Sequence, residues 1–235
     1  MHRASRPRRS GPIVVVALLA LMAAGAVAHA VGPDTDAERQ RLAMLDAGEK
    51  GDLSAINRLI TVGTKVDVRD ESLRTPLYMA VTANRIEAVK LLLSEGASVN
   101  AQARDLETPW LLAAALGHAD MLKLMIPHGP DLSIHNRFGG SALIPACEKG
   151  HVEAVRVLLA TAIDVNHANT FGWTCLIEIA YLTDGGPRHL EIVRQVLAAG
   201  ADPNLADRHG KTALAHAQAR HLTALAAILK THGAR

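Results

Sequence analysis

The hydrophobic positions of the chain recur at a nearly constant interval, which equals the number of residues from Thr75 to Thr108. Each period holds a short apolar segment that follows a Thr or Ser, then a turn with glycine, and then a second apolar segment. The Thr or Ser positions are Thr75, Thr108, Ser141, Thr174 and Thr212, and only the last interval, from Thr174 to Thr212, is longer than the others. Units this small bury their apolar faces only by stacking on each other. The pattern therefore predicts one elongated, all-α solenoid.

Each unit is expected to contain two helices joined by a tight turn, followed by an extended loop. The Thr or Ser hydroxyl caps the first helix, and Pro76 and Pro109 occupy its first position, where a missing N–H costs nothing. Ser141 is expected to be such a cap. Pro145 lies a turn inside its helix, which it is expected to distort locally because it removes a backbone hydrogen bond.

The period also predicts where the units begin and end. In chain order they are a capping unit at residues 42–70, full units at 71–103, 104–136, 137–169 and 170–207, and a C-terminal capping unit at 208–235. The extra residues 184–188, which lengthen the last interval, are expected to form a loop between the two helices of their unit. Residues 31–41 are expected to be a flexible N-terminal segment.

Residues 1–30 have a different pattern. Four arginines precede an uncharged apolar run from Ile13 to Ala28, which ends in the small-residue site Ala28-His29-Ala30. This order is typical of a secretory signal peptide, so residues 1–30 are expected to be cleaved and the mature protein to be periplasmic. The alternative is an uncleaved membrane anchor, but a run of about 16 residues is short for a hydrocarbon core of ~30 Å.

Cleavage would change the charge of the protein. The precursor has 25 basic and 23 acidic residues, and the segment removes four arginines and no acid, which leaves 21 against 23 and a net charge of −2. A mature surface of mixed sign lacks the basic patch typical of nucleic-acid-binding proteins. Neither nucleic acid nor, after cleavage, a membrane is therefore expected as a partner.

The repeated residues resemble those of the ankyrin repeat. The motifs Thr-Pro-Leu-x-x-Ala, Gly-His, Val-x-x-Leu-Leu and Gly-Ala-Asp-x-Asn occur at matching offsets from about Leu42 to the C-terminus. The resemblance implies a right-handed stack of helix pairs with hairpin fingers, which acts as a protein-binding surface. With an export signal in front, the chain is similar to the secreted bacterial ankyrin-repeat proteins.

The resemblance also separates framework positions from free positions at the hairpin tips, just before the Thr, and at the end of the first helix. Of the six aromatic residues, Tyr78 and Trp110 fall at framework positions, where core packing is expected. The other four fall at free positions of two adjacent units, and Trp and Tyr are frequent in binding hot spots. With a flanking arginine and a leucine they form the predicted partner-binding site: Arg137, Phe138, Phe171, Trp173, Tyr181 and Leu182. The alternatives are that these side chains only pack on each other, or that their positions are due to chance.

Metal, catalytic and disulfide chemistry find little support in the sequence. No metal-ligand spacing such as His-Glu-x-x-His, no nucleophile elbow and no phosphate-binding glycine loop occurs, so no catalytic residue, metal or cofactor is expected. Cys147 and Cys175 lie six and one residues after the Ser or Thr of adjacent units, which predicts a Cα separation of about 11 Å. A disulfide needs less than ~7 Å, so two free, buried thiols are expected.

The sequence thus favours an exported, monomeric, non-catalytic module that binds a protein or peptide partner on its concave and fingertip face. Two other functions stay open. One is a self-associating structural or assembly protein whose aromatic residues contact a second copy. The other is a module that senses a small ligand or a metal.

Overall fold

Helices follow one another in pairs along residues 35–235, the part of the chain that the computed structural model describes. They are α1 (Asp36–Lys50), α2 (Leu53–Thr61), α3 (Pro76–Thr82), α4 (Ile86–Ser94), α5 (Pro109–Leu116), α6 (Ala119–Met125), the 3₁₀ helix η1 (Ile126–His128), α7 (Leu143–Glu148), α8 (Val152–Leu159), α9 (Cys175–Leu182), α10 (Pro187–Ala198), α11 (Ala213–Ala219) and α12 (Thr223–Thr231). These residues contain no β-strand, only an isolated bridge between Ala206 and Thr212. The predicted signal peptide, residues 1–30, lies outside the described residues.

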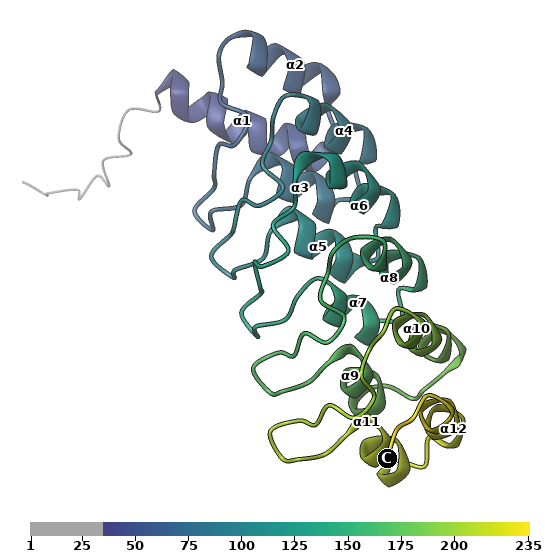
Figure 1. Cartoon of the computed structure of the whole chain (residues 1–235). Helices are drawn as coiled ribbons and strands as arrows, with labels where there is room; N and C mark the ends of the chain where they lie inside the picture. The colour runs from purple at the N-terminus through teal and green to yellow at the C-terminus, as the bar shows by residue number, and fades with distance from the viewer. Residues whose placement is uncertain (1–34) are drawn as a thin grey trace, which may run out of the picture. The chain divides into compact units, whose positions relative to one another are not determined.

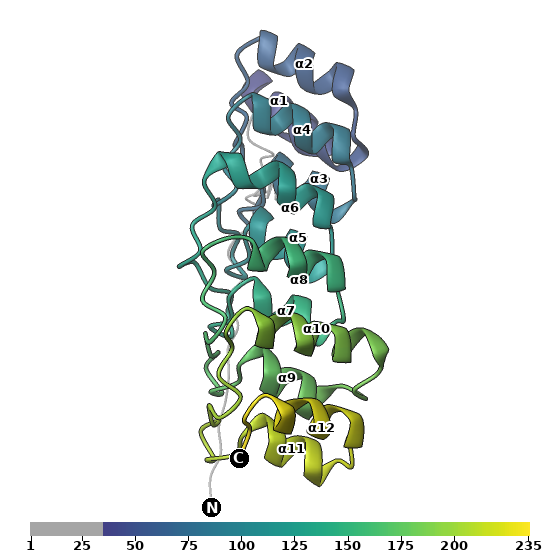
Figure 2. The ribbon, with the colours of Figure 1, turned by 45° about the vertical axis from the view of Figure 1, so that its right-hand side comes forward.

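The helix pairs form two layers. The first helices of the pairs, α1, α3, α5, α7, α9 and α11, pack on each other in that order, and the second helices pack in the same order beside them. The loops between pairs project along one side of the stack as hairpins (Figure 1), and the second helices form the opposite side (Figure 2). The buried residues run through all the pairs as one continuous hydrophobic core, which includes Trp110, while Tyr78 is also buried. The expected all-α solenoid is confirmed.

The hydroxyl caps form at four of the five expected positions. The Oγ1 atoms of Thr75, Thr108, Thr174 and Thr212 accept hydrogen bonds from the backbone N–H three residues later, at 3.1–3.4 Å. Ser141 is the exception, since its Oγ is buried and has no partner among the described residues.

Pro145 explains the missing cap. In the other units the Thr carbonyl accepts from the N–H four residues later, a group that Pro145 lacks. The Ile144 N–H donates to the Ser141 carbonyl instead, at 3.3 Å, and is no longer available to the hydroxyl. Helix α7 accordingly begins only at Leu143, so the expected distortion is present and the expected cap is wrong.

Helical structure begins earlier than expected. The segment 31–41, expected to be flexible, is helical from Asp36 onward, while residues 31–34 lie outside the described residues. The Thr35 hydroxyl caps α1 by accepting from the Glu38 N–H at 3.2 Å, and the Glu38 carboxylate pairs with Arg41. A capping residue and an acidic first turn favour a helix start here.

The 184–188 insertion is a loop only in its first part. Residues 183–186 connect α9 to α10, but Pro187 is the first residue of α10 and Arg188 the second. Proline suits this position because its fixed φ matches the helix and its missing N–H would have no partner there. The expectation of a loop is therefore wrong for these two residues, and α10 gains length at its N-terminus.

Cys147 and Cys175 form a disulfide, with a Cα–Cα distance of 5.6 Å, so the expectation of free thiols is wrong. That expectation placed equivalent residues of neighbouring first helices directly side by side. The helices are instead staggered, and the end of one lies beside the start of the next. The same stagger brings Gly48 of α1 against the backbone of Pro76, the first residue of α3, at the offsets of the two cysteines. The bridge therefore joins α7 to α9 without distorting the stack.

Candidate functional site

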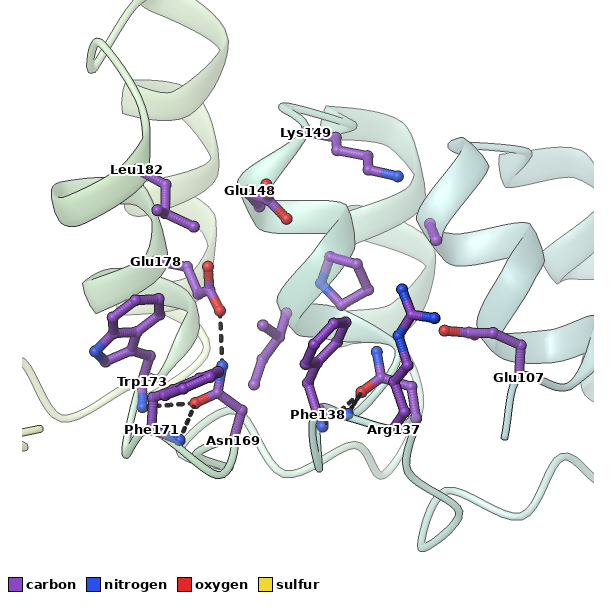
Figure 3. A pocket seen from close by; sticks show the side chains of 15 residues that line it. Glu107, Arg137, Phe138, Glu148, Lys149, Asn169, Phe171, Trp173, Glu178 and Leu182 are labelled. Carbon is purple, nitrogen blue, oxygen red and sulfur yellow. Dashed lines mark hydrogen bonds between the residues drawn. The ribbon is translucent and has the colours of Figure 1, made fainter. Parts of the chain in front are cut away.

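A pocket of about 350 Å³ lies among α7, α9 and the two hairpins that precede them. Five of the six predicted site residues line it: Arg137, Phe138, Phe171, Trp173 and Leu182 (Figure 3). Tyr181 is not among its lining residues, but its ring packs on Trp173 with 4.7 Å between centroids. The structure thus brings the predicted residues together in one region, which leaves their role in binding a prediction.

Phe171, Trp173 and Tyr181 pack on each other, whereas the Phe138 ring contacts the Arg137 guanidinium. Phe171 lies 5.1 Å from Trp173, and Tyr181 makes an edge contact with His216 at 5.1 Å, so the rings form a continuous row. Even so, Phe138, Phe171 and Tyr181 each keep 44–49% of their surface exposed. Mutual packing therefore accounts for only part of their surface, and the rest faces solvent.

The hairpin tips that carry the two phenylalanines are held by asparagine side chains. Asn169 Oδ1 accepts from the N–H groups of Phe171, at 2.9 Å, and Trp173, at 3.0 Å. Asn136 Oδ1 accepts in the same way from Phe138 and the glycine two residues beyond it. A further bond, from the Thr170 N–H to the Phe138 carbonyl at 2.9 Å, joins one tip to the other. The aromatic rings are thus presented on braced hairpins.

Glu178 is the buried charged group of the pocket. The residue is 5% exposed, and its Oε1 accepts from the Asn169 amide at 2.8 Å (Figure 3). Its Oε2 is buried and has no hydrogen-bond partner within residues 35–235. Burial, and secondly the negative charge of Glu148, raise the pKa of Glu178 to about 7, against the opposing effect of the Asn169 bond.

Glu107 marks the other end of the pocket. Burial raises the pKa of this carboxyl, and the negative charge of Asp105 adds to the rise. The positive charges of Arg137 and Lys149 act in the opposite direction on its pKa. The Arg137 guanidinium, which lies 4.8 Å from the centre of the Phe138 ring, points toward Glu107 in Figure 3. The two basic residues of the pocket therefore act on Glu107.

Sequence reasoning missed the polar part of the pocket. Apart from Arg137, which was predicted, it is formed by Glu107, Asn136, Glu148, Lys149, Asn169 and Glu178. The sequence positions of three of them indicate a possible contact surface. Glu148 and Lys149 lie at the end of a first helix, and Glu107 lies just before a Thr; these are positions that the stacking of the repeats leaves free. A search for aromatic residues alone passed over them. Glu178 had a weaker signal, as a charged residue within the apolar run of α9.

Metal ligation and membrane insertion gain no support from the described part of the chain. Across residues 35–235, no group of three or more His, Cys, Asp or Glu side chains is arranged to hold a metal ion. Over the same range, no helix has both the length and the hydropathy needed to cross a bilayer.

Comparison with known proteins shows what kind of repeat this is. A family model described as ankyrin repeats (3 copies) matches residues 18–103 and 110–207. An ankyrin repeat domain (ABAYE2397) from Acinetobacter baumannii AYE is similar with 42% identity and a TM-score of 0.79, over 82% of this chain and 98% of that one. The ankyrin repeat protein EF0377 is similar with 38% identity and a TM-score of 0.77, over 80% and 96%.

A more distant similarity is found to the ankyrin repeat domain of Bcl-3, a member of the IkappaB protein family, with 28% identity and a TM-score of 0.74, over 82% of this chain and 86% of that one. No curated protein sequence matches. The matched residues cover most of the chain, and the helix pairs, hairpins and capped first helices agree with the match. The chain belongs to the ankyrin-repeat family.

Proposed function

We propose that this protein is an exported, non-catalytic module that binds a protein or peptide partner at the pocket between α7, α9 and their hairpins. Ankyrin repeats generally mediate protein–protein interaction, and that general function applies to this chain. The proposal adds the place of binding and the compartment.

The observation that carries the proposal is a group of exposed aromatic side chains beside a pocket, two of them on braced hairpins and one, Tyr181, near the end of α9. Phe138, Phe171 and Tyr181 keep nearly half of their surface exposed, although exposed apolar surface lowers solubility. Rigid aromatic residues lose little conformational entropy on binding, and they dominate binding hot spots. A partner that covers them would bury this surface without first having to order it.

Two observations support export. Residues 1–30 have the order of a secretory signal peptide. Independently, Cys147 and Cys175 are bonded, and structural disulfides persist in oxidising compartments such as the periplasm. The proposed compartment is therefore the periplasm. Thiol mapping of the protein isolated from cells tests this proposal, and reduced Cys147 and Cys175 thiols would contradict it.

The test of partner binding uses paired variants of the mature protein. Phe171→Ala with Trp173→Ala should abolish capture of a partner from periplasmic extract while helical content, measured by circular dichroism, stays unchanged. The matched control is Leu53→Ala with Val62→Ala, which truncates two exposed apolar side chains far along the chain from the pocket. Equal capture by both double variants would contradict the proposed site.

Self-association is the second candidate, because the same exposed aromatic row could contact a second copy of the chain. Sedimentation of the mature protein separates the two functions. A dimer that forms with increasing concentration and is lost in Trp173→Ala would favour assembly, whereas a monomer at all concentrations favours a different partner.

A further inference from the structure

We propose that the pocket receives a cationic side chain, lysine or arginine, of the bound polypeptide, and that Glu178 Oε2 accepts its hydrogen bond. The inference rests on the proposed function and specifies the chemistry of the partner. It concerns the polar end of the pocket, which the aromatic residues alone do not explain.

Within residues 35–235, the hydrogen bonding of Glu178 is incomplete. Buried carboxylate oxygens are normally bonded, and one left without a partner costs free energy. The amide of Asn169 does not bond to Oε2: its oxygen accepts from the hairpin N–H groups and its nitrogen donates to Oε1. Oε2 therefore remains without a donor within the described chain, and because it is buried, the adjoining side chains must shift for a partner's cation to reach it. In Figure 3 this end of the carboxylate points away from Asn169, toward the side where Glu148 and Leu182 lie.

The charge that acts on this carboxylate is negative. Glu148, on α7, is the neighbouring charge that acts on Glu178, and it has the same sign. The basic residues of the pocket, Arg137 and Lys149, act on Glu107 instead. The lining contains three carboxylates and two basic side chains, so one negative charge is in excess when all are ionised. A cation from a partner would balance it.

Three aromatic side chains line the pocket: Phe138, Phe171 and Trp173. Cations bind favourably over the faces of Trp and Phe rings. The pocket already contains one such contact, the Arg137 guanidinium over Phe138 at 4.8 Å. In Figure 3, Trp173 and Phe171 lie on the side of the pocket nearer to Glu178, so an incoming ammonium or guanidinium would meet both an aromatic surface and a carboxylate.

The size of the pocket suits an amino-acid side chain of a partner better than a bulky organic ligand. Its volume of about 350 Å³ is at the lower end of the range for ligand sites, roughly 300–1,000 Å³. One or two side chains of an extended segment would fill it. The segment itself would lie across the braced hairpin tips, where Phe138 and Phe171 are exposed.

The test is a selection of random peptides displayed on phage against the immobilised mature protein at pH 8. Only peptides whose binding is lost with Phe171→Ala and Trp173→Ala are kept, and their sequences are aligned. We expect lysine or arginine at one aligned position. Pocket-dependent peptides without a basic position would overturn this inference and leave the proposed function standing, whereas no pocket-dependent peptide at all would contradict both.

One selected peptide is then measured by calorimetry against Glu178→Gln. Replacing its basic residue by norleucine should weaken binding to the unmodified protein by about tenfold or more, as expected for a charge-assisted hydrogen bond. The same replacement should have little effect on binding to Glu178→Gln. The control Glu87→Gln removes the same charge from an exposed position on α4 and should behave as the unmodified protein does. Equal losses with all three proteins would overturn the role of Glu178.

The pH dependence gives a further check on the same complexes. Because the pKa of free Glu178 is about 7, affinity for the basic peptide should fall several-fold from pH 8 to pH 6. Glu107, Glu148, Arg137 and Lys149 are unchanged in Glu178→Gln, so a fall that persists in this variant would count against the proposal.

Discussion

The contribution of Glu178 to the free energy of unfolding should depend on pH. In the unfolded chain this carboxyl has its ordinary pKa of 4.5, whereas in the folded protein burial and Glu148 raise the pKa to about 7. Between these values the unfolded chain ionises while the folded protein still binds the proton. Ionisation therefore favours the unfolded state, and the contribution of Glu178 to stability falls as pH rises through this window.

The size of the effect follows from the two pKa values. Their difference, at 1.36 kcal/mol for each pH unit, corresponds to roughly 3 kcal/mol lost between pH 4.5 and pH 8. Glu178→Gln keeps the shape of the side chain and an oxygen that accepts from Asn169, but it cannot ionise. The variant should thus gain stability relative to the unmodified protein as pH rises, by about that amount.

Urea unfolding followed by circular dichroism, at several pH values from 4.5 to 8, measures the difference. The difference between the two proteins cancels the contributions of titrating groups that do not interact with Glu178. Glu87→Gln, at an exposed position, should show a constant difference over this range. A constant difference for Glu178→Gln as well would refute the argument that a buried, half-bonded carboxylate lies in this pocket.

Three other changes test the framework around the pocket. Cys147→Ala with Cys175→Ala opens a loop of 28 residues and should lower the free energy of unfolding by about 3–4 kcal/mol. In the unmodified protein, the buried disulfide should resist reduction until the protein unfolds. Asn169→Ala removes the acceptor for two hairpin N–H groups and the donor to the buried carboxylate, and should cost about 2 kcal/mol in urea unfolding and weaken partner binding. Pro145→Ala restores an N–H to the Ser141 carbonyl and frees the hydroxyl to cap α7; a gain of about 1 kcal/mol is expected, and a loss would contradict the explanation of the missing cap.

The sequence was sufficient to predict those features of the fold that depend only on the residues of a single repeat and on the length of the repeat. Apolar spacing, the Thr caps and Pro at the first helical position are local features, so the helix pairs, their order and the placing of Tyr78 and Trp110 in the core follow from them. The start of α1 was missed, although Thr35 and the acidic first turn are a local signal that was open to use.

What depends on how one unit lies against the next could not be predicted in the same way. The disulfide was missed because the stagger between α7 and α9 is a property of the stack and not of either helix. The environment of Glu178 was missed for a similar reason, since Asn169 comes from the preceding hairpin and Glu148 from the preceding unit. The predicted aromatic residues did converge, because three of them occupy free positions of one unit and Phe138 occupies the hairpin tip of the unit before it.

The most direct test of partner binding at the pocket is site-specific photo-crosslinking in living cells. A benzophenone-bearing phenylalanine is placed at position 171, at the pocket, or at position 62, an exposed position beyond α2. We expect a discrete adduct with another protein from position 171, which is lost when Trp173→Ala is added, and none from position 62. The same adducts from both positions, or none from position 171, would contradict partner binding at the pocket.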